Sequence, residues 1–223
     1  LLDVRRAGSA LPEARFEFVE LLGQGGMGRV LLVADHDIRR TVAMKVLLPR
    51  HRRDASLVSR FLDEVQIAGQ LEHPNILPIH EFGVVEGEPW FTMKQVEGET
   101  LRHLLARRGF LRPVEAARLI AAVADVVGAA HSAQVVHRDL KPANVLLDRR
   151  RSGAPRVTDF GLAHDQRLAG QLTVTGQMLG TPVYMAPEQF LGHKVDARTD
   201  VYALGVLLYE CLTGRLPHQA PTI

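Results

Sequence analysis

The feature that most constrains the fold of this 223-residue chain is a change in the spacing of its apolar residues near Gly98. Before this point most apolar segments are short and rich in β-favouring residues, whereas after it the longer apolar segments have the spacing of helices. A purely β or purely α chain would not show this change. The sequence therefore predicts an α+β fold in which a strand-rich unit precedes a helical one, with a cleft between them.

The first unit contains five candidate strands and one candidate helix. Residues Phe16–Val33 favour a strand, a glycine-rich turn and a second strand, and Thr41–Leu48 favours a third. Residues Ser56–Leu71 repeat apolar positions every three or four residues, which is typical of an amphipathic helix. Two further strands are expected at Ile76–Phe82 and Trp90–Val96.

The second unit contains three candidate helices and several short extended segments. The helices are expected at Thr100–Arg108, Pro113–His131 and Thr199–Thr213, with Gly214 ending the last one. The short extended segments are Val135–Val136, Val145–Leu147 and Arg156–Thr158.

Composition excludes several classes of function. With 27 Lys and Arg against 25 Asp and Glu, the formal net charge of +2 predicts neither a nucleic-acid partner nor binding to an anionic membrane. A single cysteine excludes an internal disulfide framework and a cysteine-built zinc site. Metal ligation is not expected for four of the histidines, because no carboxylate or cysteine accompanies them as a metal site would require: His73, His80, His131 and His137. No apolar stretch is long enough to span a bilayer, and the first residues do not resemble a signal peptide.

A glycine-rich segment at residues 23–30 is the first motif that carries chemistry. Its sequence, GQGGMGRV, follows the pattern GxGxxGxV. Glycines allow backbone N–H groups to approach phosphate oxygens without interference from a Cβ atom. Because a strand and not a helix follows, the pattern does not favour a dinucleotide-binding βαβ turn. Taken alone, it indicates either a phosphate-binding loop or a simple glycine-rich hairpin.

A lysine on an apolar strand is the second candidate. Lys45 lies in the sequence VAMKV, and the helix that follows offers Asp63 and Glu64 as partners. At 100° per residue Glu64 falls on the apolar arc of that helix, whereas Asp63 points away from it. A carboxylate on an apolar face is costly unless it is paired, so we expect Glu64 to form an ion pair with Lys45.

The densest group of polar residues is HRDLKPAN at residues 137–144, followed by DFG at 159–161 and APE at 186–188. Phosphoryl transfer needs a base for the attacking hydroxyl, a cation near the transferred phosphate and oxygen ligands for Mg²⁺. Asp139, Lys141, Asn144 and Asp159 supply these groups within one short stretch. The ordered set indicates phosphoryl transfer far more strongly than any single triplet.

Together the motifs GQGGMGRV, AMK, HRDLKPAN, DFG and GTPVYMAPE resemble those of eukaryotic-type, or Hanks-type, serine/threonine protein kinases, and are most similar to bacterial members. The resemblance implies a two-lobed protein-kinase-like fold, with a five-stranded antiparallel sheet and one helix in the N-lobe and a mainly helical C-lobe. The expected boundaries are an N-terminal extension at 1–14 and a kinase domain at 15–223, with lobes at 15–97 and 98–223.

The family has further helices that would follow the last residue, so the C-lobe is expected to be C-terminally truncated. Two consequences are expected. Glu188 would lack an arginine partner that those helices carry, and part of the helix at Val201–Leu212 would face water.

The resemblance also implies a role for each motif residue. Asp139 would be the catalytic base, Lys141 would neutralise charge on the γ-phosphate of ATP, and Asn144 and Asp159 would bind Mg²⁺ or Mn²⁺. Asp200 would both cap its helix and accept hydrogen bonds from the backbone at residues 137–138. Met93 would be the gatekeeper beside a hinge at residues 94–96. The implied ATP-binding residues are Leu22, Gly23, Gln24, Gly25, Gly26, Met27, Gly28, Arg29, Val30, Ala43, Lys45, Glu64, Met93, Val96 and Leu146.

Arg138 beside the catalytic aspartate implies regulation by phosphorylation, because a buried arginine can bind a phosphate on the activation segment. That segment contains the sequence TVT, and we expect autophosphorylation of Thr173 or Thr175. The alternative is that both are ordinary polar loop residues.

The implied function is transfer of the ATP γ-phosphate to serine or threonine residues of proteins in signal transduction. A pseudokinase or scaffold that binds nucleotide without efficient catalysis is the alternative, and a small-molecule phosphotransferase would leave GTPVYMAPE unexplained. Protein substrates are the expected partners, together with a second copy of the chain for autophosphorylation, and no nucleic acid. The expected location is cytoplasmic, either free or as the cytoplasmic part of a longer, membrane-anchored protein.

Overall fold

The computed structural model describes residues 15–85, 87–160 and 182–218. Within these residues the chain forms two compact units. Unit 1 comprises the described residues up to Glu72 together with Leu77–Val96, and unit 2 comprises His73–Ile76 and the described residues from Glu97 onward. The chain therefore leaves unit 1 after Glu72, returns after Ile76 and leaves it again after Val96.

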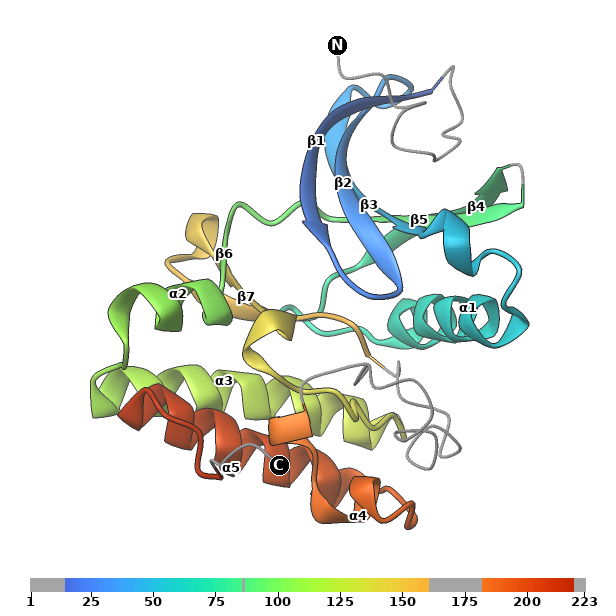
Figure 1. The fold of residues 1–223 in the computed structure, drawn as a ribbon. Helices are drawn as coiled ribbons and strands as arrows, with labels where there is room; N and C mark the ends of the chain where they lie inside the picture. The colour runs from blue at the N-terminus through green and yellow to red at the C-terminus, as the bar shows by residue number, and fades with distance from the viewer. Residues whose placement is uncertain (1–14, 86, 161–181, 219–223) are drawn as a thin grey trace. The chain divides into compact units, whose positions relative to one another are not determined.

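Unit 1 is built on one antiparallel five-stranded sheet with the order β1-β2-β3-β5-β4. Its strands are β1 (Phe16–Gln24), β2 (Gly28–Asp35), β3 (Arg40–Leu47), β4 (Ile79–Val85) and β5 (Glu88–Met93), as Figure 1 shows. The predicted sheet is thus confirmed. The fourth strand begins later than predicted, because Ile76 instead forms an isolated bridge to Val157 in unit 2.

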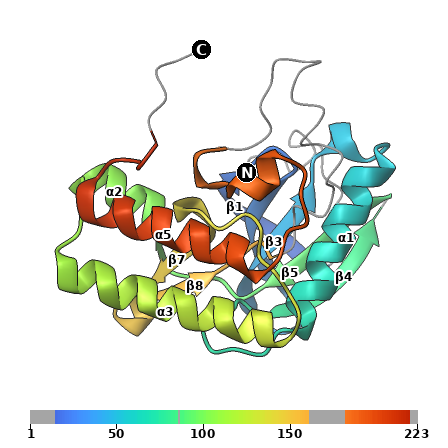
Figure 2. The ribbon, with the colours of Figure 1, turned by 90° about the horizontal axis from the view of Figure 1, so that it is seen from below.

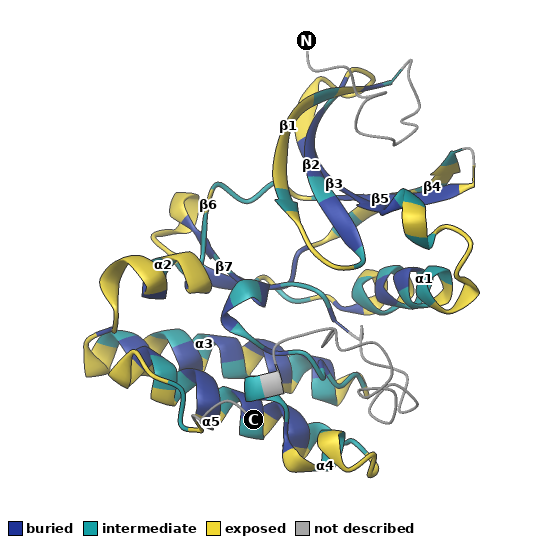
Figure 3. Cartoon of the chain, in the orientation of Figure 1, coloured by how far each residue is buried: buried dark blue, intermediate teal, exposed yellow. Residues whose placement is uncertain are grey.

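The two faces of this sheet differ. Residues opposite each other on antiparallel strands share a face, and successive residues alternate between faces. Lys45 lies opposite Val30 on β2 and Phe91 on β5, so these three residues share one face. Figure 3 shows most of β3 and β5 buried. The opposite face contributes a buried apolar cluster made of Phe16, Leu31, Val33, Val42, Met44, Val46 and Trp90.

Helix α1 (Ala55–Gln70) packs on the face that carries Lys45. It follows a short 3-10 turn, η2 (Pro49–His51), and the Asp54 side chain caps its first turn by accepting hydrogen bonds from two backbone N–H groups. Phe61 on α1 is fully buried, with its ring centroid 5.3 Å from that of Phe91. The helix was predicted nearly to its bounds because its amphipathic spacing is a local signal.

Gly28 is a position where only glycine fits. A Cβ atom at this residue would lie 2.6 Å from the carbonyl oxygen of Val46 on the neighbouring strand. Such contact would force the strands apart. The last glycine of the glycine-rich motif therefore has a packing role in the β2–β3 pair.

Unit 2 contains most of the α-helices of the described residues. Its helices are α2 (Leu101–Arg108), α3 (Pro113–Ser132), the short α4 (Pro187–Phe190) and α5 (Ala197–Thr213). Helices α3 and α5 lie side by side, as Figures 1 and 2 both show. The buried residues of α3 recur along one side of the helix, from Ala116 to Ala130. None of the helices within the described ranges is long and apolar enough to cross a membrane.

A small antiparallel sheet completes unit 2, with the order β6-β7-β8. Its strands are β6 (Gly98–Thr100), β7 (Val145–Asp148) and β8 (Ala154–Val157). Unit 2 also contains the 3-10 turns η3 (Pro142–Asn144), η4 (Arg149–Arg151) and η5 (Pro182–Tyr184).

Two expectations for unit 2 are wrong, and one strand was not predicted. Val135–Val136 is not a strand, because it lies in the connection that turns from α3 into the HRDLKPAN sequence. Strand β6 was not predicted, since a three-residue strand gives no periodic signal. Asp200 does not cap α5: the helix begins at Ala197, and Asp196 accepts the capping hydrogen bond from the backbone of Arg198.

Glu188, which was expected to lack an arginine partner, has a hydrogen-bond partner of another kind in the structure. The hydroxyl of Thr199 donates to it at 2.6 Å. Part of α5 is exposed as expected, with exposed fractions of 61% for Val201, 45% for Tyr209 and 39% for Leu212.

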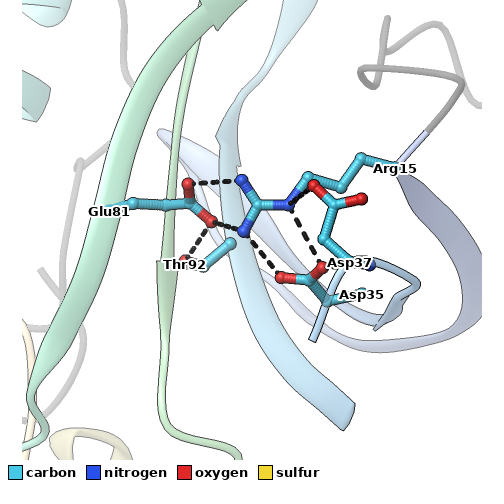
Figure 4. Close-up of polar contacts among 5 residues, drawn as sticks. All are labelled: Arg15, Asp35, Asp37, Glu81 and Thr92. Atoms are coloured by element: carbon cyan, nitrogen blue, oxygen red, sulfur yellow. Dashed lines mark hydrogen bonds and ion pairs between the residues drawn. The ribbon is translucent and has the colours of Figure 1, made fainter. Parts of the chain in front are cut away.

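A charged cluster joins the start of the described chain to two strands of unit 1 (Figure 4). The guanidinium of Arg15 donates to both oxygens of Asp35, at 3.1 and 2.7 Å, and to both oxygens of Glu81, at 2.9 and 2.8 Å. Asp37 forms a further ion pair at 3.3 Å. The side chain of Asp35 is only 1% exposed, and its hydrogen bonds with Arg15 lower its pKa below the usual value of 3.8.

We predict that Arg15→Met lowers the free energy of unfolding by about 2 kcal/mol at pH 7, because Asp35 then remains buried without its cation. The pKa of Asp35 is lowered in the folded state, so its stabilising effect is present above pH 3.8 and is lost as pH falls through the lowered value. In the variant that effect is absent, and the difference between the two proteins should shrink below about pH 4. Urea unfolding at several pH values measures both effects.

The matched control for this prediction is Arg198→Met. Arg198 also pairs with a carboxylate, that of Asp196, but its side chain is 88% exposed. The Arg198→Met variant should leave the free energy of unfolding unchanged, because exposed ion pairs contribute little to stability. Equal losses in the two variants would contradict the assigned importance of the Arg15 cluster.

Candidate active site

In unit 1 the expected ion pair between Lys45 and Glu64 is present. The Lys45 Nζ atom lies 2.6 Å from Glu64 Oε1, and the two side chains are 9% and 3% exposed. The ammonium also lies 5.9 Å from the centre of the Phe91 ring. Strand β3 and helix α1 thus hold one cation at a fixed place on the sheet face, where low solvent exposure strengthens its interaction with any nearby anion.

The same face of unit 1 carries the residues expected beside a nucleotide base. Ala43 lies opposite Met93 on β5, and Val30 lies opposite Lys45, so all four share the face. In the glycine-rich segment no atom lies within 4 Å of a Cβ position at Gly23 or Gly26. Packing therefore does not require glycine at these two positions, and there is room beside them for another group.

The remaining expected ATP-binding residues are spread over both units. Arg29 is buried, and this burial lowers its pKa, partly opposed by the charge of Glu88. Because it alternates with Val30 along β2, its side chain lies on the other face of the sheet. Leu146, on β7, belongs to unit 2.

The residues after β5 that are expected to form the hinge also have defined contacts. The backbone N–H of Lys94 donates to the carbonyl of Pro78 at 3.3 Å, and the Thr41 hydroxyl donates to the amide oxygen of Gln95 at 2.7 Å. Both contacts lie within unit 1.

In unit 2 three of the expected catalytic and metal-binding residues lie together. Lys141 Nζ is 2.7 Å from Asp139 Oδ2, and the side-chain amide of Asn144 donates to the backbone carbonyl of Asp139 at 2.8 Å and to its Oδ2 at 3.3 Å. The carboxylate of Asp139 is 29% exposed. It is therefore held on one side by a cation and an amide while it stays accessible to solvent.

Asp159 is placed next to this group through its neighbours in the chain. The backbone of Thr158 donates to the carbonyl of Asn144 at 3.0 Å, and the Thr158 carbonyl lies 3.0 Å from Nε2 of His137. The ring of Phe160 packs against that of His137 with centroids 4.7 Å apart. Asp159 itself has a φ of 61°, a left-handed conformation that is uncommon for a residue with a side chain.

Asp200 organises the turn that precedes Asp139. This carboxylate is 1% exposed and accepts hydrogen bonds from the backbone N–H groups of His137 and Arg138, both at 2.8 Å. The expected contact with the backbone of this turn is thus present. Nε2 of His131, at the end of α3, lies 2.7 Å from the same carboxylate.

The pairing of His131 with Asp200 was not predicted, because the two residues are 69 positions apart in the sequence and no local pattern connects them. A buried aspartate in an apolar helix is the signal that could have prompted a search for a distant donor. Even with this pair, the described residues contain no group of three or more His, Cys, Asp or Glu side chains placed to hold a metal ion.

Arg138 has an unusual environment. Its backbone adopts a left-handed conformation with a φ of 66°, and its carbonyl accepts a hydrogen bond from the side chain of Gln189 at 2.8 Å. The Nε atom of its guanidinium is buried and has no hydrogen-bond partner among the described residues. Thr173 and Thr175, the expected phosphorylation sites, lie outside the residues that the structure describes.

Comparison with known proteins decides the family. The sequence matches the protein kinase domain family over residues 16–222. The chain belongs to the protein kinase family.

The kinase domain is similar to bacterial serine/threonine kinases. It is 39% identical to serine/threonine-protein kinase PknD of Mycobacterium tuberculosis over 208 residues, which cover 93% of this chain and 31% of the relative. It is 38% identical to serine/threonine-protein kinase PrkC of Bacillus subtilis over 203 residues, which cover 91% of this chain and 31% of the relative. The chain thus spans less than a third of the length of these relatives.

The fold is also that of a protein kinase. The crystal structure of the Mycobacterium tuberculosis PknI kinase domain superposes with a TM-score of 0.74 at 32% identity, covering 95% of this chain and 80% of the other. The predicted fold, with a five-stranded antiparallel sheet and one helix in the first part and mainly helices in the second, is confirmed.

We predict that Asp200→Asn lowers the free energy of unfolding by about 2 kcal/mol, because an amide cannot accept from all the donors that surround this buried position. The measurement is a thermal or urea unfolding curve. Asp196→Asn is the matched control on the same helix. It should leave stability unchanged, since asparagine and aspartate cap helices equally well. An unchanged Asp200→Asn variant would show that this network has little energetic weight.

Proposed function

We propose that the chain is a serine/threonine protein kinase domain that transfers the γ-phosphate of ATP to serine and threonine hydroxyls of protein substrates. The observation that carries this proposal is the environment of Asp139. One oxygen of its carboxylate is held by Lys141 and Asn144, while the group remains partly exposed and can accept a proton. This is the arrangement that a positioned base requires.

In the proposed reaction the substrate hydroxyl oxygen attacks the γ-phosphorus. The bond from that phosphorus to the bridging oxygen breaks, and its electron pair leaves with ADP. The hydroxyl proton passes to the carboxylate of Asp139. Lys141, 2.7 Å from this carboxylate, supplies positive charge beside the place where the phosphoryl group would be transferred.

The ATP phosphates would be held by unit 1. Lys45, fixed by Glu64, would bind the α- and β-phosphates, and the backbone of residues 22–30 would cover them. The open space beside Gly23 and Gly26 supports this role, since neither glycine is required by internal packing. Adenine would contact the apolar side chains of Val30, Ala43, Met93 and Val96 in unit 1.

The residues of unit 2 fit a magnesium ion. The side-chain nitrogen of Asn144 already donates to Asp139, so its oxygen is the atom available as a ligand, and Asp159 adds a carboxylate. Mg²⁺ commonly takes only one or two protein oxygens and completes its shell with water and phosphate. Asn144 and Asp159 would hold the ion, or Mn²⁺ in its place. When bound, it would neutralise charge on the ATP phosphates.

We predict that Asp139→Asn lowers the rate of phosphate transfer from radiolabelled ATP to a generic acceptor protein such as casein by about 10²- to 10⁴-fold, with little change in ATP affinity. The loss follows from removal of the base while the nucleotide contacts in unit 1 remain. Asp125→Asn, which changes an exposed aspartate on α3, is the matched control and should keep full activity. A wild-type chain that binds ATP but transfers no more phosphate than Asp139→Asn would favour a pseudokinase instead.

Regulation by phosphorylation would act through Arg138. Its buried Nε lacks a hydrogen-bond partner among the described residues, and a phosphate oxygen would supply one. The phosphate would be carried by Thr173 or Thr175, and would be placed there by a second copy of the chain.

We predict that incubation with Mg²⁺ and ATP phosphorylates Thr173 or Thr175, as detected by mass spectrometry, and that Asp139→Asn shows no such modification. The double change Thr173→Ala with Thr175→Ala should lower the transfer rate, whereas Thr213→Ala, a threonine at the end of α5, should not. Absence of phosphate from both threonines in the active wild-type chain would contradict the proposed regulation.

A further inference from the structure

An open hollow in unit 2 has no role in the proposed catalysis. Its volume is about 1300 Å³, and its walls come from β6, α2, the start of α3, and η4 with β8. Figure 1 shows α2, β6 and the N-terminal end of α3 near one another. The residues assigned to phosphoryl transfer do not line it, so it is a separate surface feature of the kinase domain.

The charged lining of the hollow is strongly one-sided. Five arginines line it against two glutamates, and no lysine is among them. Both glutamates already have arginine partners. Glu115 accepts from Arg108 at 2.6 and 3.0 Å, and Glu99 pairs with Arg107 at 2.5 Å. Their negative charge is therefore balanced by these arginines.

Three of the lining arginines are left without a carboxylate partner among the described residues: Arg118, Arg149 and Arg151. Arg151 donates only to neutral oxygens, the carbonyl of Pro74 and the side chain of Asn75. Arg118 and Arg149 are exposed, on α3 and η4 respectively. The hollow thus presents positive charge from two different elements.

The start of α3 adds to this positive potential. Pro113, Val114 and Glu115 form its first turn and line the hollow. The N-cap residue Arg112 makes no capping hydrogen bond with its side chain. The first N–H groups of a long helix carry partial positive charge, which favours an anion nearby.

The hollow also has an apolar part. Leu111 and Leu147 are 1% and 9% exposed, whereas Val114 is 63% exposed. Leu104 and Leu119 line it as well. An exposed valine beside buried leucines offers a place for an apolar side chain of a ligand.

Close packing gives the hollow a fixed wall. At Gly98, on β6, a Cβ atom would lie 1.8 Å from the carbonyl oxygen of Leu147 on β7. Only glycine allows the two strands to approach this closely, and both residues line the hollow. A ligand would therefore meet a surface that is already formed.

We propose that this hollow is a docking site for an acidic peptide segment of a partner protein, with glutamate or aspartate side chains interspersed with leucine-like residues. The carboxylates would pair with Arg118 and Arg149, whose guanidinium groups suit bidentate binding. The apolar side chains would pack on Val114 and the leucines beside it. Charge complementarity and the apolar lining both favour such a peptide over a simple phosphate ligand or a nucleic acid, because neither of those would use the apolar part.

The test is fluorescence anisotropy with the wild-type chain and a fluorescein-labelled peptide made of alternating pairs of glutamate and leucine. We expect Arg118→Glu combined with Arg149→Glu to weaken binding about tenfold or more. The matched control, Arg53→Glu combined with Arg215→Glu, changes net charge equally at exposed positions outside the hollow and should leave affinity within about twofold. If both pairs of substitutions weakened peptide binding equally, the loss of affinity would follow from net charge alone, and the proposal would be overturned.

A second pair of variants tests the apolar part. Val114→Asp should weaken binding of the same peptide, whereas Val201→Asp on α5, at a similarly exposed valine, should not. Circular dichroism confirms that each variant is folded. A peptide with glutamine in place of glutamate should bind about tenfold more weakly. Tighter binding of duplex DNA or inorganic phosphate than of the acidic peptide would overturn the assignment to a peptide.

None of these measurements depends on phosphate transfer. A chain without kinase activity could still bind the peptide, and an active kinase could fail to bind it. The outcome for the hollow is therefore separate from the outcome for the proposed catalytic function.

Discussion

The buried carboxylate of Asp200 is the constraint on which the candidate site of unit 2 depends. It accepts from two consecutive backbone N–H groups and faces His131, so three donors converge on a side chain that solvent hardly reaches. A buried anion is tolerable only when its hydrogen bonds are complete. The turn at His137 and Arg138 is therefore held in one shape, including the left-handed conformation of Arg138. Asp139 follows directly in the sequence, so the shape of this turn determines where Asp139 lies.

Unit 1 uses the same physical device for a cation. Lys45 is held on the sheet by Glu64, which helix α1 brings to it from the apolar face. A buried ion pair adds little net stability compared with well-packed apolar residues, but breaking it leaves an uncompensated charge. Both units thus use a buried charge to fix the position of a polar group of the candidate site.

The sequence predicted those parts of the fold that depend on local patterns. Helices α1, α3 and α5 follow from apolar spacing, and the pairing of Lys45 with Glu64 follows from the face on which Glu64 lies. The missed features depend on distant residues. His131 and Asp200 meet only because α3 and α5 pack together, and Arg15 reaches Glu81 across 66 positions of the chain. The proposed catalytic roles come from resemblance to a family, since no spacing rule alone assigns a base or a metal ligand.

The short segment His73–Ile76 has a consequence for the synthesis of the protein. It belongs to unit 2, although unit 1 residues lie on both sides of it in sequence. Its contacts are with residues made much later: Arg151 and Arg156 donate to the carbonyl of Pro74, and Val157 pairs with Ile76. During synthesis this segment leaves the ribosome before Arg151, Arg156 and Val157 have been added to the chain. Ile76 is 3% exposed in the folded chain. Until Val157 has been synthesised, Ile76 lacks this packing partner, and its exposed apolar side chain is a binding site for a chaperone.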